Sequence, residues 1–111
     1  INSAFFDTLK PILDKLNITA LHKIKANITI KSNSVKSYEL HSDMPHALKN
    51  NVIGKTGIFY LHNTDGPTVF ENQQKIDCVE NRMIIFSSDK KHSGSTHTNE
   101  QFRGVINFNW F

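Results

Sequence analysis

The fold class is decided by the stretch Leu21-His22-Lys23-Ile24-Lys25-Ala26-Asn27-Ile28-Thr29-Ile30-Lys31. From Lys23 onward, polar and apolar residues alternate along this stretch. A period of two predicts a half-buried β-strand, because successive side chains of a strand point to opposite faces. We expect the apolar face to be buried and the face that carries Lys23, Lys25 and Lys31 to be a solvated sheet surface.

The residues before this strand repeat at helical spacing instead. Apolar side chains recur on one side of an amphipathic helix that is expected to extend from the first residues to Leu16, at Phe5, Phe6, Leu9, Ile12, Leu13 and Leu16. Pro11 lacks a backbone N–H group, so the helix is expected either to kink there or to restart with Asp7 or Thr8 as its cap.

After the strand, short extended segments alternate with polar turns. Further strands are expected at about 37–41, 56–62, 67–71, 75–79, 82–86, 92–96 and 102–110, with breaks at 63–66, 71–74, 80–81 and 87–91 and a loop at 44–51. The residues Met83 to Phe86 are expected in the core. One helix followed by about eight short strands predicts a mainly β protein, a sandwich or a jelly roll.

Composition restricts the classes of function. The 111 residues suffice for one domain, 1–111, and the net charge of +3 comes from scattered basic residues, so no nucleic-acid partner is expected. Cys78 is the only cysteine, which excludes an internal disulfide and favours a reducing compartment. No apolar run is long enough for a membrane span, so a cytoplasmic protein is expected. Because Ile1 already belongs to the expected helix, we expect a fragment that lacks upstream helical elements.

A candidate metal site begins at His41 and Asp43. These residues are two positions apart in an expected strand, so their side chains project from the same face and one ion can bridge them. An iron ion that binds a co-substrate and oxygen needs two imidazoles and one carboxylate on one side. His92, just after the 82–86 strand, is the candidate for the second imidazole, with an ordinary loop histidine as the alternative.

The final expected strand carries one arginine, Arg103. Alternation places Asn107 and Asn109 on the same face as this guanidinium. Inside a barrel that excludes water, a buried guanidinium needs an anion, and a carboxylate that accepts two hydrogen bonds is its natural partner. The alternative for an isolated arginine is a surface ion pair.

At these residues the sequence resembles the iron(II)- and 2-oxoglutarate-dependent dioxygenases, in particular their prolyl-hydroxylase-like branch. His41-Ser42-Asp43 resembles the HxD motif of that family, His92 its distal histidine, and Arg103 its co-substrate arginine. Tyr60 lies in a segment similar to the strand whose tyrosine contacts the same carboxylate. Gly66-Pro67-Thr68-Val69-Phe70 is similar to the family's Gly-Gly-x-Thr-x-Phe stretch, with Pro67 in place of a glycine.

The resemblance implies a fold, a cofactor set and a reaction. The fold is the double-stranded β-helix, a cupin-like jelly roll. Iron(II) is then held by His41, Asp43 and His92, and 2-oxoglutarate is bound in a pocket assigned to Arg103, Tyr60 and Asn109. With oxygen, and with ascorbate as a further candidate cofactor, such a protein hydroxylates a C–H bond and produces succinate and carbon dioxide.

The substrate is less defined than the cofactors. Resemblance favours prolyl or peptidyl hydroxylation, on a peptide or a small molecule. Nucleic-acid demethylases of the superfamily usually carry a second arginine six positions after the first, where this chain has Asn109, so that activity is the less favoured one. A third hypothesis is a cupin-like, metal-containing binding module without turnover.

Overall fold

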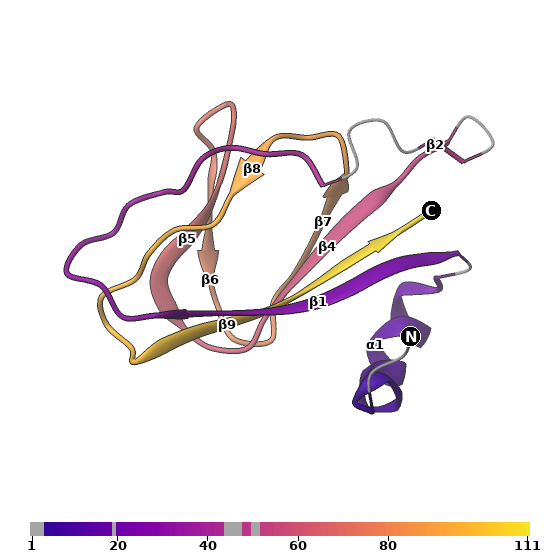
Figure 1. The fold of residues 1–111 in the computed structure, drawn as a ribbon, viewed down its shortest axis with the longest axis horizontal. Helices are drawn as coiled ribbons and strands as arrows, with labels where there is room; N and C mark the ends of the chain where they lie inside the picture. The colour runs from indigo at the N-terminus through magenta and orange to yellow at the C-terminus, as the bar shows by residue number, and fades with distance from the viewer. Residues whose placement is uncertain (1–3, 19, 44–47, 50–51) are drawn as a thin grey trace.

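The computed structural model describes residues 4–18, 20–43, 48–49 and 52–111. Antiparallel strands form two facing sheets, with a short helical segment beside the first strand (Figure 1). Nine strands lie in the described part of the chain, two of them a β2–β3 hairpin (Leu48–Lys49 and Val52–Ile53). The predicted mainly β architecture is therefore confirmed.

The helical segment is shorter than its periodicity predicts. It consists of the 3-10 turn η1 (Phe6–Leu9) and the α-helix α1 (Lys10–Leu16). The α-helix starts at Lys10, so Pro11 lies in its first turn, where proline is tolerated, and the expected restart is observed. The predicted caps are wrong, since the N-cap position is Leu9, which makes no side-chain capping bond. Neither described helix has the length and apolarity needed to cross a membrane.

The larger sheet has four strands. β1 (Leu21–Ile30), β9 (Phe102–Trp110), β4 (Lys55–Tyr60) and β7 (Met83–Ser87) lie side by side in that order, so the first and last strands of the chain are neighbours. The predicted bounds of these strands agree with the observed ones to within two residues.

The smaller sheet contains β6 (Lys75–Cys78), β5 (Thr64–Phe70) and β8 (His92–Ser93). β5 begins at Thr64, so the break predicted at 63–66 is shorter than expected. The predicted 37–41 strand forms only isolated bridges, Ser37 with Ser95 and His41 with His92. These bridges nevertheless attach that segment to the edge beside β8. Of the predicted 44–51 loop, Leu48–Lys49 forms β2, and 44–47 and 50–51 lie outside the described residues.

The apolar face of β1 is not buried as its pattern predicts. Ile28 and Ile30 are 72% and 79% exposed. The expected solvated lysine face is confirmed, since Lys23 and Lys25 are exposed, and both lysines also line a cavity between the sheets. Alternation shows that the two faces of a strand differ, but it does not show which face packs against other elements. The polar face of β1 borders a cavity whose wall is largely polar.

The apolar core occupies only part of the space between the sheets. It is formed by Ile58, Tyr60, Cys78 and Val105, with Ile76, Ile84 and Phe86 packed against them. The prediction of core positions at 83–86 is wrong for Ile85, which is 50% exposed on the outer face of β7. Ten of the described buried residues are polar or charged and seven are hydrophobic, which marks the interior as a place for a ligand.

Candidate metal centre

The structure brings the three predicted metal ligands together. His41 Nε2 lies 3.4 Å from Asp43 Oδ1, and His92 Nε2 lies 3.5 Å from the same oxygen. The ligand atoms of all three residues lie within 4.8 Å of one another. His41 and His92 are directly opposite each other, and their backbones exchange two N–H···O hydrogen bonds of 2.9 Å.

The residues present fit a divalent transition-metal ion. Two ligand atoms that each lie about 2.1 Å from an ion are about 3.0 to 3.4 Å apart when the angle between them is right-angled or tetrahedral. The two distances to Asp43 Oδ1 are close to that range. Two imidazoles and a carboxylate on one side leave the other coordination positions open, which is the arrangement of non-haem iron(II) oxygenases.

His92 is held rigidly as a neutral ligand. Its side chain is 3% exposed, and its Nδ1 lies 3.0 Å from the Lys90 carbonyl oxygen. The neutral tautomer that satisfies this contact donates from Nδ1 and leaves the lone pair of Nε2 facing Asp43. Burial is the largest influence on the pKa of His92 and lowers it; His41 acts in the same direction, and Lys90 and Asp43 oppose it.

Asp43 is oriented by a buried polar group from the larger sheet. Its Oδ2 accepts hydrogen bonds from Thr56 Oγ1 and from Asn109 Nδ2, both at 3.0 Å. Asn109 also donates to Thr56 Oγ1 at 2.9 Å, and Ser88 Oγ lies 3.2 Å from that oxygen. The other oxygen, Oδ1, therefore remains directed at both histidines. Asn109, predicted for the co-substrate pocket, contacts the metal-ligand carboxylate instead of lining the cavity.

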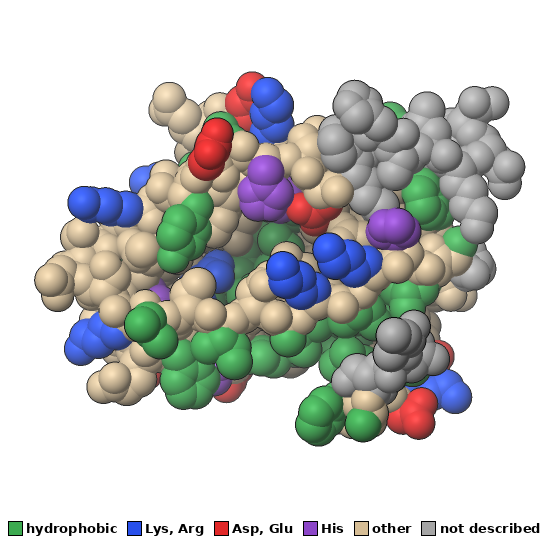
Figure 2. Space-filling model, viewed as in Figure 1, with side chains coloured by type: hydrophobic (Ala, Val, Ile, Leu, Met, Phe, Trp, Pro, Cys, Tyr) green, Lys and Arg blue, Asp and Glu red, His purple; other side chains and the backbone are tan. Residues whose placement is uncertain are grey.

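The triad opens into a cavity of about 480 Å³ between the sheets. Figure 2 looks toward this side of the molecule, where basic side chains over β1 lie opposite histidine and acidic side chains. Besides His41, Asp43 and His92, its wall includes Lys23, Lys25, Asn27, Ile28, Thr29, Tyr38, Ile58, Thr68, Gly94, Arg103, Val105 and Asn107. This volume is typical of small-molecule sites.

Arg103 lies in the wall of this cavity and is only 5% exposed. Its Nε donates to the Gly66 carbonyl at 3.0 Å, which fixes the plane of the guanidinium. Within the described part of the chain, no acceptor bonds its terminal nitrogens and no carboxylate pairs with it. A buried charge without a counter-charge is unfavourable, so this position is suited to an anionic ligand.

Tyr60 lies behind Arg103. It is completely buried, its hydroxyl oxygen is 2.6 Å from Thr68 Oγ1, and the Arg103 guanidinium carbon is 5.8 Å from its ring centroid. Burial is the main cause of the raised pKa of the Tyr60 hydroxyl, which keeps it protonated. Thr68, rather than Tyr60, lines the cavity. The Gly66–Phe70 motif was the sequence signal for this threonine.

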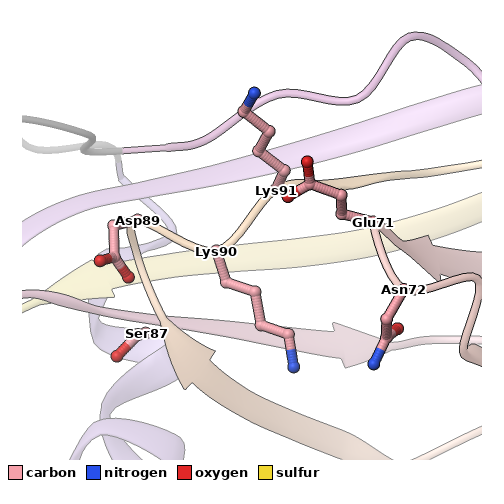
Figure 3. Close-up of a pocket in the computed structure, with 6 residues that line it drawn as sticks. All are labelled: Glu71, Asn72, Ser87, Asp89, Lys90 and Lys91. Atoms are coloured by element: carbon pink, nitrogen blue, oxygen red, sulfur yellow. The ribbon is translucent and has the colours of Figure 1, made fainter.

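A second hollow of about 490 Å³ lies on the outer side of the loop that precedes His92 (Figure 3). Glu71, Asn72, Ser87, Asp89, Lys90 and Lys91 line it. Acidic and basic side chains are mixed in it, and Lys90 Nζ is 4.7 Å from the centre of the Phe70 ring. It shares no lining residue with the triad's cavity, so we place the candidate site at the triad.

The comparisons with known proteins support the fold. No family model matches the sequence, and neither does any curated protein. A cupin protein from Bacteroides fragilis has a similar structure, with 14% identity and a TM-score of 0.57 over 89% of this chain and 72% of that chain. An RmlC-like cupin protein from Desulfovibrio desulfuricans is 13% identical, with a TM-score of 0.49 over 79% of this chain and 82% of that chain. A prolyl-4-hydroxylase from Pseudomonas putida is 14% identical, with a TM-score of 0.48 over 97% of this chain and 63% of that chain.

At such low identity, the likeness concerns architecture alone. Together with the two antiparallel sheets, it identifies the chain as a cupin-like jelly roll, and this jelly roll carries a His-Asp-His group that could hold a metal ion.

Proposed function

We propose that the protein is an iron(II)- and 2-oxoglutarate-dependent oxygenase that hydroxylates a C–H bond. The observation that carries this proposal is Arg103, a buried guanidinium without a carboxylate partner among the described residues, in the same cavity as an open His-Asp-His face. A metal site alone fits many cupin-like proteins. The combination with an unpaired buried cation fits a co-substrate that chelates the metal at one end and carries a carboxylate at the other.

The protein's residues divide the work in this proposal. His41, Asp43 and His92 occupy one side of the ion, and the Thr56–Asn109 pair keeps Asp43 Oδ1 directed at it. Iron(II) bound there supplies oxygen activation and, with 2-oxoglutarate, the oxidation of a substrate C–H bond with release of succinate and carbon dioxide.

The other end of the cavity orients the co-substrate. The terminal nitrogens of Arg103 bind its distal carboxylate through two parallel hydrogen bonds. Burial keeps Tyr60 protonated, so it can donate to Thr68 Oγ1, and in that arrangement the Thr68 hydroxyl is free to donate to the same carboxylate. Ile58 and Val105, both 5% exposed, provide the apolar wall that limits water entry.

The test separates metal binding, co-substrate binding and turnover. Calorimetry with Mn(II), which replaces iron without turnover, should show 2-oxoglutarate binding only to metal-loaded protein. With iron(II), oxygen and ascorbate, succinate should form above the level given by the His92→Ala variant, while Asn33→Ala, an exposed position, serves as the matched control. Failure of the metal-loaded protein to bind 2-oxoglutarate would overturn the proposal.

A second candidate is a metal-containing binding module without turnover. One structural match, with a TM-score of 0.57, is a protein described simply as a cupin, and this likeness motivates the second candidate. In that case Arg103 holds another carboxylate. Metal-dependent binding of 2-oxoglutarate with no succinate, even in the presence of ascorbate, would favour the module over the enzyme.

Prolyl or peptidyl hydroxylation stays a prediction from the sequence resemblance. The basic side chains in the described wall of the cavity bear on the class of substrate.

A further inference from the structure

We propose that Lys23 and Lys25 bind a carboxylate group of the substrate at the metal end of the cavity. This inference rests on the proposed function, because it assumes that Arg103 is occupied by 2-oxoglutarate. It follows from the position of the polar face of β1, which makes both lysines part of the cavity wall while leaving them exposed to solvent.

The register of the larger sheet separates the two cationic positions. Lys23 lies opposite Asn109, whose side chain bonds the metal ligand Asp43, whereas Thr29 lies opposite Arg103. Lys25 and Thr29 are four residues apart, which corresponds to about 13 Å along a strand. The lysines are therefore near the metal, and the guanidinium is at the far end. An anion bound by Arg103 cannot also account for the lysine pair.

The described wall of the cavity carries more positive than negative charge, and the two lysines in it are exposed to solvent, where they attract an anionic ligand. Lys23, Lys25 and Arg103 are cationic, and Asp43 is the one carboxylate in the described wall. Asp43 serves the metal, and a divalent ion adds two further positive charges. A bound 2-oxoglutarate dianion offsets the ion, and the two lysines remain. Among the described residues, neither lysine has an acidic partner.

The spacing of the lysines fits one small anionic group. Residues two apart on the same face of a strand are about 6.5 Å apart, and two flexible ammonium groups can converge from there on a single carboxylate. Asn107 lies opposite Lys25, and Asn27 follows on the same inner face, so amide groups adjoin the position. A carboxylate held there brings a neighbouring C–H bond toward the open side of the metal.

The experiment measures binding to Mn(II)- and 2-oxoglutarate-loaded protein. The probes are short carboxylic acids, each paired with its uncharged carboxamide: propanoate, butanoate and N-acetyl-L-proline in one arm, and Gly-Glu-Gly against Gly-Gln-Gly, both N-acetylated and C-amidated, in the other. We expect acids to bind and amides to bind at least about tenfold more weakly. If the free acids bind and the peptide does not, the substrate carboxylate belongs to a small acid. If the glutamate peptide binds, the carboxylate belongs to a peptide side chain.

The double variant Lys23→Gln/Lys25→Gln should weaken acid binding by about tenfold or more while leaving the affinity for 2-oxoglutarate within about twofold. Lys31→Gln, an exposed lysine outside the cavity wall, is the matched control, and thermal melting confirms that each variant folds. Equal binding of acids and amides, absence of acid binding, or loss of 2-oxoglutarate affinity in the double variant would each overturn the inference. Failure of wild-type protein to bind 2-oxoglutarate would instead count against the proposed function.

Discussion

Arg103 carries its charge at a position where the described chain supplies no counter-charge. A guanidinium that served only the fold would be expected to pair with a carboxylate, since that is how buried charges are usually compensated. Here the protein fixes the guanidinium through Gly66 and leaves its terminal nitrogens to the cavity. We therefore expect Arg103 to lower the stability of the ligand-free protein, because its charge is uncompensated there, and to hold the guanidinium in position for an anionic ligand.

This interpretation predicts that Arg103→Met weakens 2-oxoglutarate binding without lowering the melting temperature. The ligand-free variant should have an unchanged or raised melting temperature, because a desolvated charge is replaced by an apolar side chain of similar length. Its affinity for 2-oxoglutarate should fall by about tenfold or more, with metal affinity retained. Calorimetry and thermal melting measure these quantities. A variant that melts much earlier yet binds 2-oxoglutarate normally would show that Arg103 is structural.

Asn109 acts on the metal through Asp43. Asn109→Ala removes one of the two donors to Asp43 Oδ2, so the carboxylate is less well oriented, and metal affinity should fall by about 10- to 100-fold. A Mn(II) titration measures the change, with Asn33→Ala as the control at an exposed position. An unchanged affinity would mean that Thr56 alone suffices to hold the carboxylate.

At the scale of elements, substitutions can test directly whether the apolar side chains of β1 are exposed. Ile30 is 79% exposed and Ile58 is 5% exposed. Ile58→Ala should therefore lower the free energy of unfolding by about 2 to 5 kcal/mol, and Ile30→Ala by less than about 1 kcal/mol. Urea denaturation of the two variants measures both values. Similar large losses would place Ile30 in a core, as its periodicity alone predicts.

The start of β5 is fastened to the loop before β9 by Asp65. Its carboxylate accepts a hydrogen bond of 2.7 Å from the Thr98 backbone N–H and another from the Thr98 hydroxyl, and these bonds lower the pKa of Asp65 below its ordinary value of 3.8. A carboxyl with a lowered pKa in the folded state stabilises the protein above pH 3.8, and that contribution disappears as the pH falls through the lowered value.

We therefore compare wild type with Asp65→Asn in urea unfolding at several pH values. The wild type should be the more stable protein at pH 5 to 7, and the difference should shrink as the pH falls below about 4. Asp77→Asn, at an exposed position whose side chain makes no hydrogen bond among the described residues, is the control. A difference that stays constant across this range would mean that the carboxylate charge does not contribute.

For the molecule as a whole, a metal ion bound by His41, Asp43 and His92 would join a peripheral segment to the sheets. The segment before Asp43 is held at Tyr38 and His41 by backbone hydrogen bonds to Gly94 and His92. Zn(II) or Mn(II) should raise the melting temperature, because it binds the folded state preferentially, and EDTA should reverse the effect. Hydrogen exchange should slow at the amides of Tyr38 and His41, and change little at Val105 within the larger sheet. Equal slowing of exchange at all three amides would indicate that the metal stabilises the whole fold and does not specifically fix the segment before Asp43.

The sequence allowed the order and type of the elements to be predicted, because hydrophobic periodicity and turn residues are local signals. It also indicated His41, Asp43 and His92, whose ligand atoms the structure brings within 4.8 Å of one another. Both results depend on spacing along the chain, which the printed residues contain.

Other features depend on contacts between distant segments. Thr56 and Ser88 come from β4 and from the loop after β7, and nothing in their immediate sequence indicates that they meet Asp43 and Asn109. The exposure of the apolar face of β1 was also missed, since alternation alone does not tell which face of a strand packs against other elements. The pairing of β1 with β9 places the side chains of Lys23, Lys25 and Thr29 on the side of the cavity.

The unequal exposure of the two histidine ligands has a consequence for the rate of metal exchange. The side chain of His41 is 57% exposed, whereas that of His92 is 3% exposed. An imidazole near solvent can swing away and be replaced by water, while a packed one cannot, so the ion should arrive at and depart from the His41 side. Chelators would then act stepwise, first on a partly released ion still held by His92 and Asp43, and the lifetime of the loaded protein would depend on how often a single exposed ring turns outward.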